Sequence, residues 1–262
     1  MKKRSKAIIL FLSILLVIFT LTSCINKDSF KKSGYFTYTY DYNDSKFYSI
    51  AGLTEEGEQQ ETLVFPSQIN GRKVNRIGVY EPLTFADATY RIVHFFESEK
   101  LKTIYFPKGY WYTSLNKSFY ENLSCVETVY WGDTFQCLSL INSCVKNIYV
   151  STQFINEQDS SPNYKDGFLN MFPRFHLANV EYYMNDGTED VYFVDHVSGT
   201  KVNVEPSIPY REGYTFRGWY KDIELTQLFD FENDIIPEIK LDEEGKEIID
   251  VTKIYASWDL KN

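Results

Sequence analysis

The side chains best suited to covalent or metal chemistry in this 262-residue chain are Cys24, Cys125, Cys137, Cys144, His94, His176 and His196. No two cysteines have the C-x-x-C spacing of zinc or redox sites, and the histidines stand singly along the chain. We therefore expect no metal, and solvated or packed histidines. A glycine-rich phosphate loop, a G-x-S-x-G elbow and an H-E-x-x-H pair are all missing from the sequence. A catalytic pairing of His94 with Cys125 stays open, but the sequence predicts a non-enzyme without a cofactor.

Cys24 stands apart from the other cysteines because of what precedes it. The basic start MKKRSK and the uncharged run of residues 7–23 have the layout of an export signal. The alternative is an uncleaved anchor, since the run is at the lower edge of the length that spans a bilayer. Leu21, Thr22 and Ser23 lead into the cysteine.

This Leu-Thr-Ser-Cys box resembles the bacterial lipobox. The resemblance implies that residues 1–23 are a lipoprotein signal peptide and that the thiol of Cys24 carries acyl lipid. It also implies that residues 24–33 are a flexible tether to the outer side of the cell membrane.

The net charge of the chain limits the kinds of partner that it can bind. The full chain carries a net charge of −9, and loss of the leader removes Lys2, Lys3, Arg4 and Lys6, which makes the mature chain more acidic. A nucleic-acid partner requires a basic surface that releases counterions. We therefore expect no nucleic-acid binding.

The composition and the first part of the mature chain favour β-structure. Aromatic residues make up 17% of the chain, and they fit the pleated, half-buried surface of a sheet. Phe36, Tyr38, Tyr40 and Tyr42 alternate with polar residues, and a turn then leads into FYSIAGL. The pattern predicts an opening β-hairpin that caps the next core.

The middle of the chain repeats loosely in LVFPSQINGRKVNRIG, LKTIYFPKG, VETVYWGD, VKNIYVST and LANVEYYM. Short strands that cannot bury an apolar face alone do so when they stack in parallel. The first aliphatic positions of the units align as Val74, Leu101, Val126, Val145 and Leu177. We expect these five to lie in one stack.

These units resemble the BspA-type leucine-rich repeat, through Phe65-Pro66, Val74 with Ile77, Phe85, Leu101 with Ile104 and Pro107, Phe119, Cys125 with Val126, and Cys144 with Val145. The resemblance covers residues 34–179 and implies an irregular leucine-rich-repeat-like solenoid with an extended face that binds a protein. Cys125 and Cys144 hold equivalent positions in adjacent units. Stacked strands lie about 4.8 Å apart, so either a disulfide or two buried thiols fits this placement.

Residues 180–262 have a different pattern, which centres on GYTFRGWY and ends in IYASW. The pattern resembles the Listeria–Bacteroides repeat, also called the internalin B-type repeat, through Asn185, Gly187, Gly213, Phe216, Gly218, Trp219 and Trp258, among others. The resemblance implies a small β-grasp-like module. Because such a module has little room for a core, we place Phe216, Trp219 and Trp258 inside it. Gly213 and Gly218 would supply backbone conformations closed to other residues. The stretch around Glu243–Lys246 predicts an inserted hairpin before the last strand.

The sequence therefore predicts a mainly β protein without catalytic function. Our first hypothesis is a bacterial surface lipoprotein that mediates adhesion or binds an unknown protein partner. The alternative is a glycan-binding lipoprotein in which Tyr110, Trp111 and Tyr112 stack on sugars, although packing of this loop over its own coil is the simpler interpretation. A third possibility is a structural role in the envelope without a specific ligand.

Overall fold

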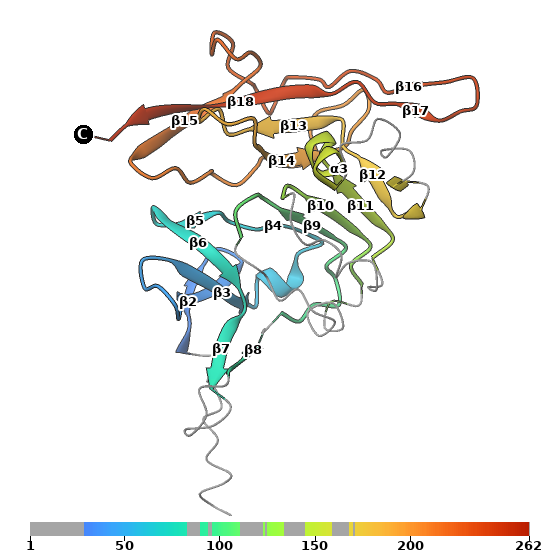
Figure 1. Cartoon of the computed structure of the whole chain (residues 1–262). Coiled ribbons are helices and arrows are strands. Elements are labelled where there is room, and N and C mark those ends of the chain that lie inside the picture. Colours follow the sequence, from blue (N-terminus) through green and yellow to red (C-terminus); the bar gives the residue numbers. More distant parts are fainter. Residues whose placement is uncertain are drawn as a thin grey trace, which may run out of the picture. The chain divides into compact units, whose positions relative to one another are not determined.

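The computed structural model describes residues 29–82, 90–93, 96–110, 123, 125–133, 145–158, 168–169 and 171–261 (Figure 1). The chain separates into two compact units, Met1–Phe30 and Lys31–Asn262. The second unit contains all the strands described below. It is built mainly from β-sheets, as the aromatic composition predicts.

The first sheet of the second unit has the strand order β1-β2-β3-β6-β5. Its strands are β1 (Lys31–Ser33), β2 (Phe36–Tyr40), β3 (Tyr48–Leu53), β5 (Gln68–Ile69) and β6 (Arg72–Ile77). The pair β2–β3 is antiparallel, as expected for the opening hairpin. Phe36 and Tyr38 are buried, but Tyr40 and Tyr42 are 44% and 60% exposed. The predicted aromatic face therefore belongs to the core only in its first half, because β2 ends at Tyr40.

The second sheet is wholly parallel and has the order β12-β11-β10-β9-β4. Its strands are β4 (Thr62–Val64), β9 (Thr103–Phe106), β10 (Thr128–Trp131), β11 (Asn147–Val150) and β12 (Phe175–Leu177). Ile104, Val129 and Ile148 stand in register across three neighbouring strands, and each is fully buried. Stacking of short strands thus buries side chains that no single strand could hide.

Two of the five positions expected in one stack lie elsewhere. Leu101, Val126 and Val145 are buried and hold the same place before β9, β10 and β11. Val74, however, pairs with Tyr48 in the first sheet, and Leu177 pairs with Val150 at the far end of β11. The prediction was wrong for Val74 because its strand belongs to the first sheet. It was wrong for Leu177 because this residue ends a strand of the parallel sheet, and the strand that follows it, β13 (Val180–Tyr183), belongs to another sheet.

Short elements connect and flank these sheets. They are η2 (Gly57–Gln59), the antiparallel pair β7 (Val79–Pro82) and β8 (Tyr90–Val93), and the helix α3 (Thr152–Gln158) after β11. The hydroxyl of Ser151 accepts a hydrogen bond from the Phe154 N–H at 3.0 Å and so caps the start of this helix.

A four-stranded mixed sheet follows, with the order β14-β13-β18-β15. Its strands are β13 (Val180–Tyr183), β14 (Val191–Asp195), β15 (Tyr214–Tyr220) and β18 (Thr252–Leu260). The central pair β13–β18 is parallel, and the two outer pairs are antiparallel. A hairpin of β16 (Lys240–Leu241) and β17 (Glu247–Ile248) precedes β18, where the sequence predicts an insertion.

One row of tyrosines joins the parallel sheet to the mixed sheet. Successive residues of a strand point to opposite faces, so Ile104 and Phe106 enter one core while Tyr105 enters the other. Tyr105, Tyr130 and Tyr149 stand in register and stack, with ring centroids 4.1 and 4.9 Å apart. Phe193 of β14 stacks on Tyr105 at 5.4 Å. The terminal strands therefore cover this face of the parallel sheet, and the two sheets share a core.

Candidate functional site

The predicted lipidation site lies outside the described residues. Cys24 and its box Leu21, Thr22 and Ser23 precede Ser29, where the description begins. Acylation of Cys24 thus stays a prediction from the sequence. Within the part of the chain that the structure describes, no helix is long and apolar enough to cross a membrane.

The aromatic loop proposed for sugar stacking is described only at its first residue. Tyr110 packs against the core that contains Phe65, and the two ring centroids are 6.3 Å apart. Its hydroxyl donates a hydrogen bond to the Pro66 carbonyl at 2.5 Å. Burial raises the pKa of Tyr110 well above its ordinary value. Trp111 and Tyr112 lie outside the described residues, so Tyr110 is the one ring of the three that can be placed.

Of the cysteines, only Cys125 is described, and its side chain is half-buried. Cys137 and Cys144 lie outside the described ranges, as does His94. The choice between a Cys125–Cys144 disulfide and two thiols therefore rests on the sequence.

The structure brings two of the histidines together, which their sequence positions do not suggest. His196 stacks on Tyr149 with ring centroids 4.6 Å apart, and His176 meets the same ring at 5.2 Å. The Nε2 atom of His196 lies 3.5 Å from a carboxylate oxygen of Glu247 on β17. Among the residues described, no group of three histidine, cysteine or acidic side chains could hold a metal ion. The cluster therefore acts as a contact between the hairpin and the tyrosine row.

Acidification should destabilise the fold through His176. Burial, and then the neighbouring His196, lower the pKa of His176 below the ordinary histidine value of about 6.5, while Glu247 partly opposes them. The unfolded chain therefore binds the proton more readily, and stability falls as the pH drops below about 6.5. We expect the melting temperature to fall between about pH 7 and pH 5, and to fall less in a His176→Gln variant. Equal falls in both proteins would contradict this assignment.

The module residues predicted to be structural lie in β15, β18 and the turn before β15. Trp219 is 2% exposed, whereas Phe216 and Trp258 are half-buried and pack against the same core. Gly213 has a φ of 77°, which suits glycine in the turn before β15. Gly218 lies at the irregularity in the β15–β18 register, with a φ of 152°. The aromatic residues of GYTFRGWY thus serve chiefly to fill a small core.

A buried carboxylate, that of Asp195, lies in this module, and no motif of the sequence singles it out. Asp195 is fully buried and accepts hydrogen bonds from the Tyr105 hydroxyl at 3.2 Å, from the His196 N–H at 2.8 Å, and from the backbone and amide N–H groups of Asn203 at 2.7 and 2.8 Å. Burial raises the pKa of Asp195, although these hydrogen bonds oppose the rise. Because every donor belongs to the fold itself, we assign Asp195 a structural role.

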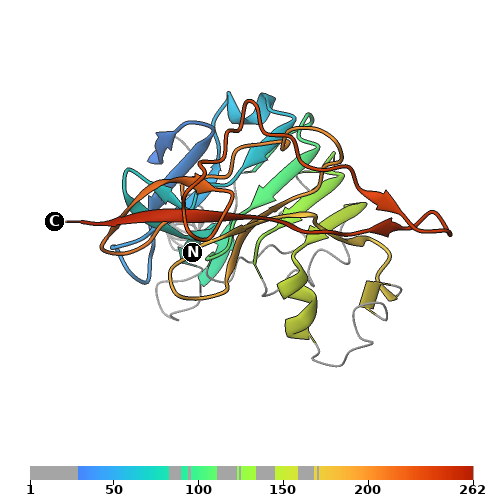
Figure 2. The same ribbon diagram turned by 90° about the horizontal axis from the view of Figure 1, so that it is seen from above.

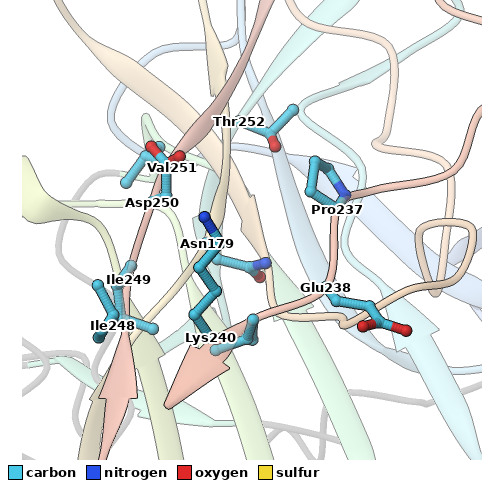
Figure 3. Close-up of a pocket in the computed structure, with 10 residues that line it drawn as sticks. Asn179, Pro237, Glu238, Lys240, Ile248, Ile249, Asp250, Val251 and Thr252 are labelled. Atoms are coloured by element: carbon cyan, nitrogen blue, oxygen red, sulfur yellow. The ribbon is translucent and has the colours of Figure 1, made fainter. Parts of the chain in front are cut away.

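The hairpin of residues 240–248, which we call the arm, forms one wall of a cavity. In Figures 1 and 2 the arm projects beyond the sheet that contains β18. The cavity beside it has a volume of about 440 Å³ (Figure 3). Its lining comprises Asn179, Pro237, Glu238, Ile239, Lys240, Ile248, Ile249, Asp250, Val251 and Thr252.

Hydrogen bonds donated by backbone N–H groups hold the segments that form the cavity walls. The Ile236 N–H donates to the Thr200 carbonyl at 2.8 Å, and the Ile239 N–H donates to the Ser198 hydroxyl at 2.9 Å. The backbone carbonyl of Asn179 accepts a hydrogen bond from the Thr252 N–H at 2.8 Å. The side-chain amide of Asn179 donates to the Val197 carbonyl and accepts from the Val197 N–H. The polar groups of Asn179 are thus already used within the fold. The lining combines five apolar side chains with five polar or charged ones, and it includes no histidine or cysteine.

The comparisons with known proteins concern the terminal part of the chain. Residues 179–241 match the family model of the Listeria-Bacteroides repeat domain. This match begins at Asn179, one residue before β13, and ends in β16, where the arm begins. A protein named "Putative membrane protein" from Evansella cellulosilytica is 34% identical over 83 residues, which are 32% of this chain and 10% of that protein. The aligned part thus spans about a tenth of the length of this relative.

Proposed function

We propose that this chain is a surface lipoprotein, anchored by an acylated Cys24, which binds another protein through the arm. Residues 34–179 would form an irregular leucine-rich-repeat-like solenoid that acts as a rigid support. The terminal residues would form a β-grasp-like module that presents the arm. The protein would have no catalytic role. The membrane-protein name of the relative is in keeping with this location.

The structure of the parallel sheet supports the proposed solenoid and bears on where a partner binds. Five parallel strands, joined by long connections, bury one face against a continuous apolar core. The opposite face carries Tyr105 and Tyr130, which are 1% and 7% exposed because the terminal strands cover them. An extended sheet face is therefore not free to bind a partner at these positions. This argues for a binding surface on the terminal module.

The exposure of the arm is the observation that carries the proposal. Leu241 and Ile248 are 60% and 50% exposed on paired strands, and Ile248 also lines the cavity. Within the described residues, β16 and β17 form a sheet of two strands. Each strand then has an outer edge at which an extended segment of a partner could add by backbone hydrogen bonds. The adjacent cavity would accept a side chain of that segment.

Leu241→Asp with Ile248→Asp should abolish capture of a partner from the surface of neighbouring or host cells. We expect affinity to fall by at least about tenfold, since charges would replace the apolar contacts. Chemical cross-linking to intact cells, followed by mass spectrometry, measures this loss. Leu260→Asp is the matched control, because Leu260 is 68% exposed at the other end of β18. Equal capture by all variants would contradict binding by the arm.

Glycan binding is the second function that the sequence suggests, and it would have to depend on Trp111 and Tyr112, since Tyr110 packs inward. The same capture experiment separates the two functions. If capture of partners is lost after glycosidase treatment of the cells, or in the Trp111→Ala variant, the result would favour glycan binding over protein binding.

A further inference from the structure

A group of basic and aromatic side chains gathers where the chain enters the first sheet. We call this group the cap cluster and define it as Lys31, Tyr40, Arg72 and Lys46. The ammonium group of Lys31 lies 4.5 Å from the centre of the Tyr40 ring, and the Arg72 guanidinium lies 5.0 Å from it. Arg72 also donates a hydrogen bond to the carbonyl of Ser45, the residue before Lys46. Lys31 and Lys46 are exposed, and Tyr40 is 44% exposed. The cluster therefore presents positive charge and an aromatic ring to its surroundings.

Few acidic side chains offset this charge. Asp41 is buried and pairs with Arg76 at 3.0 Å, so that this pair is neutral as a whole. Asp44 lies in the turn after β2, where its carboxylate accepts the Lys46 N–H at 2.9 Å. A hydrogen bond from Lys31, together with the charges of Lys31 and Arg72, lowers the pKa of Tyr40. That shift is what a positive local potential produces, although the chain as a whole carries a charge of −9.

The cap cluster is also the part of the fold closest along the chain to the proposed lipid anchor. Cys24 and Lys31 are separated by a stretch of chain that spans at most about 25 Å when fully extended. Lys31 itself begins β1. An acylated Cys24 would therefore keep this end of the sheet near the bilayer.

We propose that the cap cluster lies against the anionic headgroups of the membrane that holds the acylated Cys24. This inference rests on the proposed lipid anchoring and goes beyond it, because it assigns a face of the fold to the membrane. Each lysine or arginine close to an anionic surface adds about a fivefold gain in membrane partitioning. Tyr40 and its neighbour Tyr42 suit the interface, where amphipathic rings are favoured. The acidic remainder of the chain would be repelled from the same surface.

Lysine acetylation of the membrane-bound full chain tests the proposal. The protein is produced in a bacterium that processes lipoproteins and is then reconstituted on vesicles of phosphatidylcholine, with or without about 30% phosphatidylglycerol. We expect the anionic lipid to slow acetylation of Lys31 and Lys46 by at least about threefold, and about 1 M salt to remove the effect. Lys102 and Lys146, whose side chains are 58% and 65% exposed, are the internal controls and should react equally on both vesicles.

A charge-reversal variant sharpens the result. Lys31→Glu should weaken the protection of Lys46, whereas Lys102→Glu should leave it unchanged. The mass of the N-terminal peptide reports separately whether Cys24 is acylated, and an unprocessed leader would hold the chain on the same vesicles. Failure of acylation is thus distinguishable from failure of the cap cluster. Equal lysine rates on neutral and anionic vesicles would overturn the inference, whatever the state of Cys24.

Discussion

Gly132→Ala is expected to destabilise the whole second unit by about 3 kcal/mol, which lowers the melting temperature by about 10 °C. Gly132 follows β10, and a Cβ atom there would lie 2.4 Å from the Tyr192 carbonyl oxygen and 2.9 Å from that of Phe106. Both oxygens are fixed: Tyr192 accepts the Lys108 N–H at 2.7 Å, and Phe106 accepts the Gly132 N–H at 2.8 Å. The methyl group therefore meets backbone on two sides, and β14 must move away from β10. Thermal melting followed by circular dichroism measures the loss.

Gly187→Ala separates this clash from the ordinary cost of replacing a glycine. Gly187 has a φ of 98°, and no atom lies within 4 Å of the position that its Cβ would take. Alanine there incurs only the cost of an unfavourable backbone conformation, about 1–2 kcal/mol. If Gly132→Ala proved no more destabilising than Gly187→Ala, the close approach of β10 to β14 would be refuted.

The strands were predictable because their residues alternate with the period of a sheet. In β9 and β10 the motifs TIYF and TVYW place Ile104 and Val129 in register, as the repeat spacing requires. The inserted hairpin was predictable as well, since a charged turn containing Gly245 separates two short strands. Local pattern is sufficient for such features because neighbours along the chain determine them.

The joining of the two sheets was not predictable from the same patterns. The alternation in β9, β10 and β11 shows that Tyr105, Tyr130 and Tyr149 share a face, and their recurrence at the third residue of each strand was a visible signal. What covers that face depends on β14, which comes much later in the chain. The contacts of Asp195 with Tyr105, and of His196 with Tyr149 and Glu247, belong to the same category, since these partners come from distant strands. Sequence periodicity shows which face of a strand a side chain occupies. It does not show which distant element of the chain packs against that face.

The shared core changes how the domain boundary after residue 179 should be understood. Only Ala178 and Asn179 separate β12 from β13, and both are buried. The carboxylate of Glu181 on β13 accepts the Thr152 N–H at 2.6 Å and the Thr152 hydroxyl at 2.8 Å, and so binds the start of α3. The two parts differ in sequence pattern and in family resemblance. Their contacts nevertheless predict that they unfold together.

Tyr130→Ala tests this coupling and should cost about 3–5 kcal/mol, the range for removing a buried aromatic side chain. Tyr130 is 7% exposed and lies between the rings of Tyr105 and Tyr149. Its removal leaves a cavity between the parallel sheet and β14. Hydrogen exchange followed by mass spectrometry would then report faster opening of peptides from β9–β11 and, by a similar factor, of peptides from β13–β18.

Tyr255→Ala is the matched control for the tyrosine row. Tyr255 also stacks on a tyrosine, Tyr183, with ring centroids 5.5 Å apart, but it is half-buried and lies on β18. We expect this variant to cost about 1 kcal/mol, the value of an aromatic pair with little lost burial. Faster exchange confined to β9–β11 in Tyr130→Ala, with β13–β18 unchanged, would show that the terminal module unfolds independently. Faster exchange by a similar factor in both sets of peptides would instead mean that the module covers and stabilises the parallel sheet, in addition to supporting the arm.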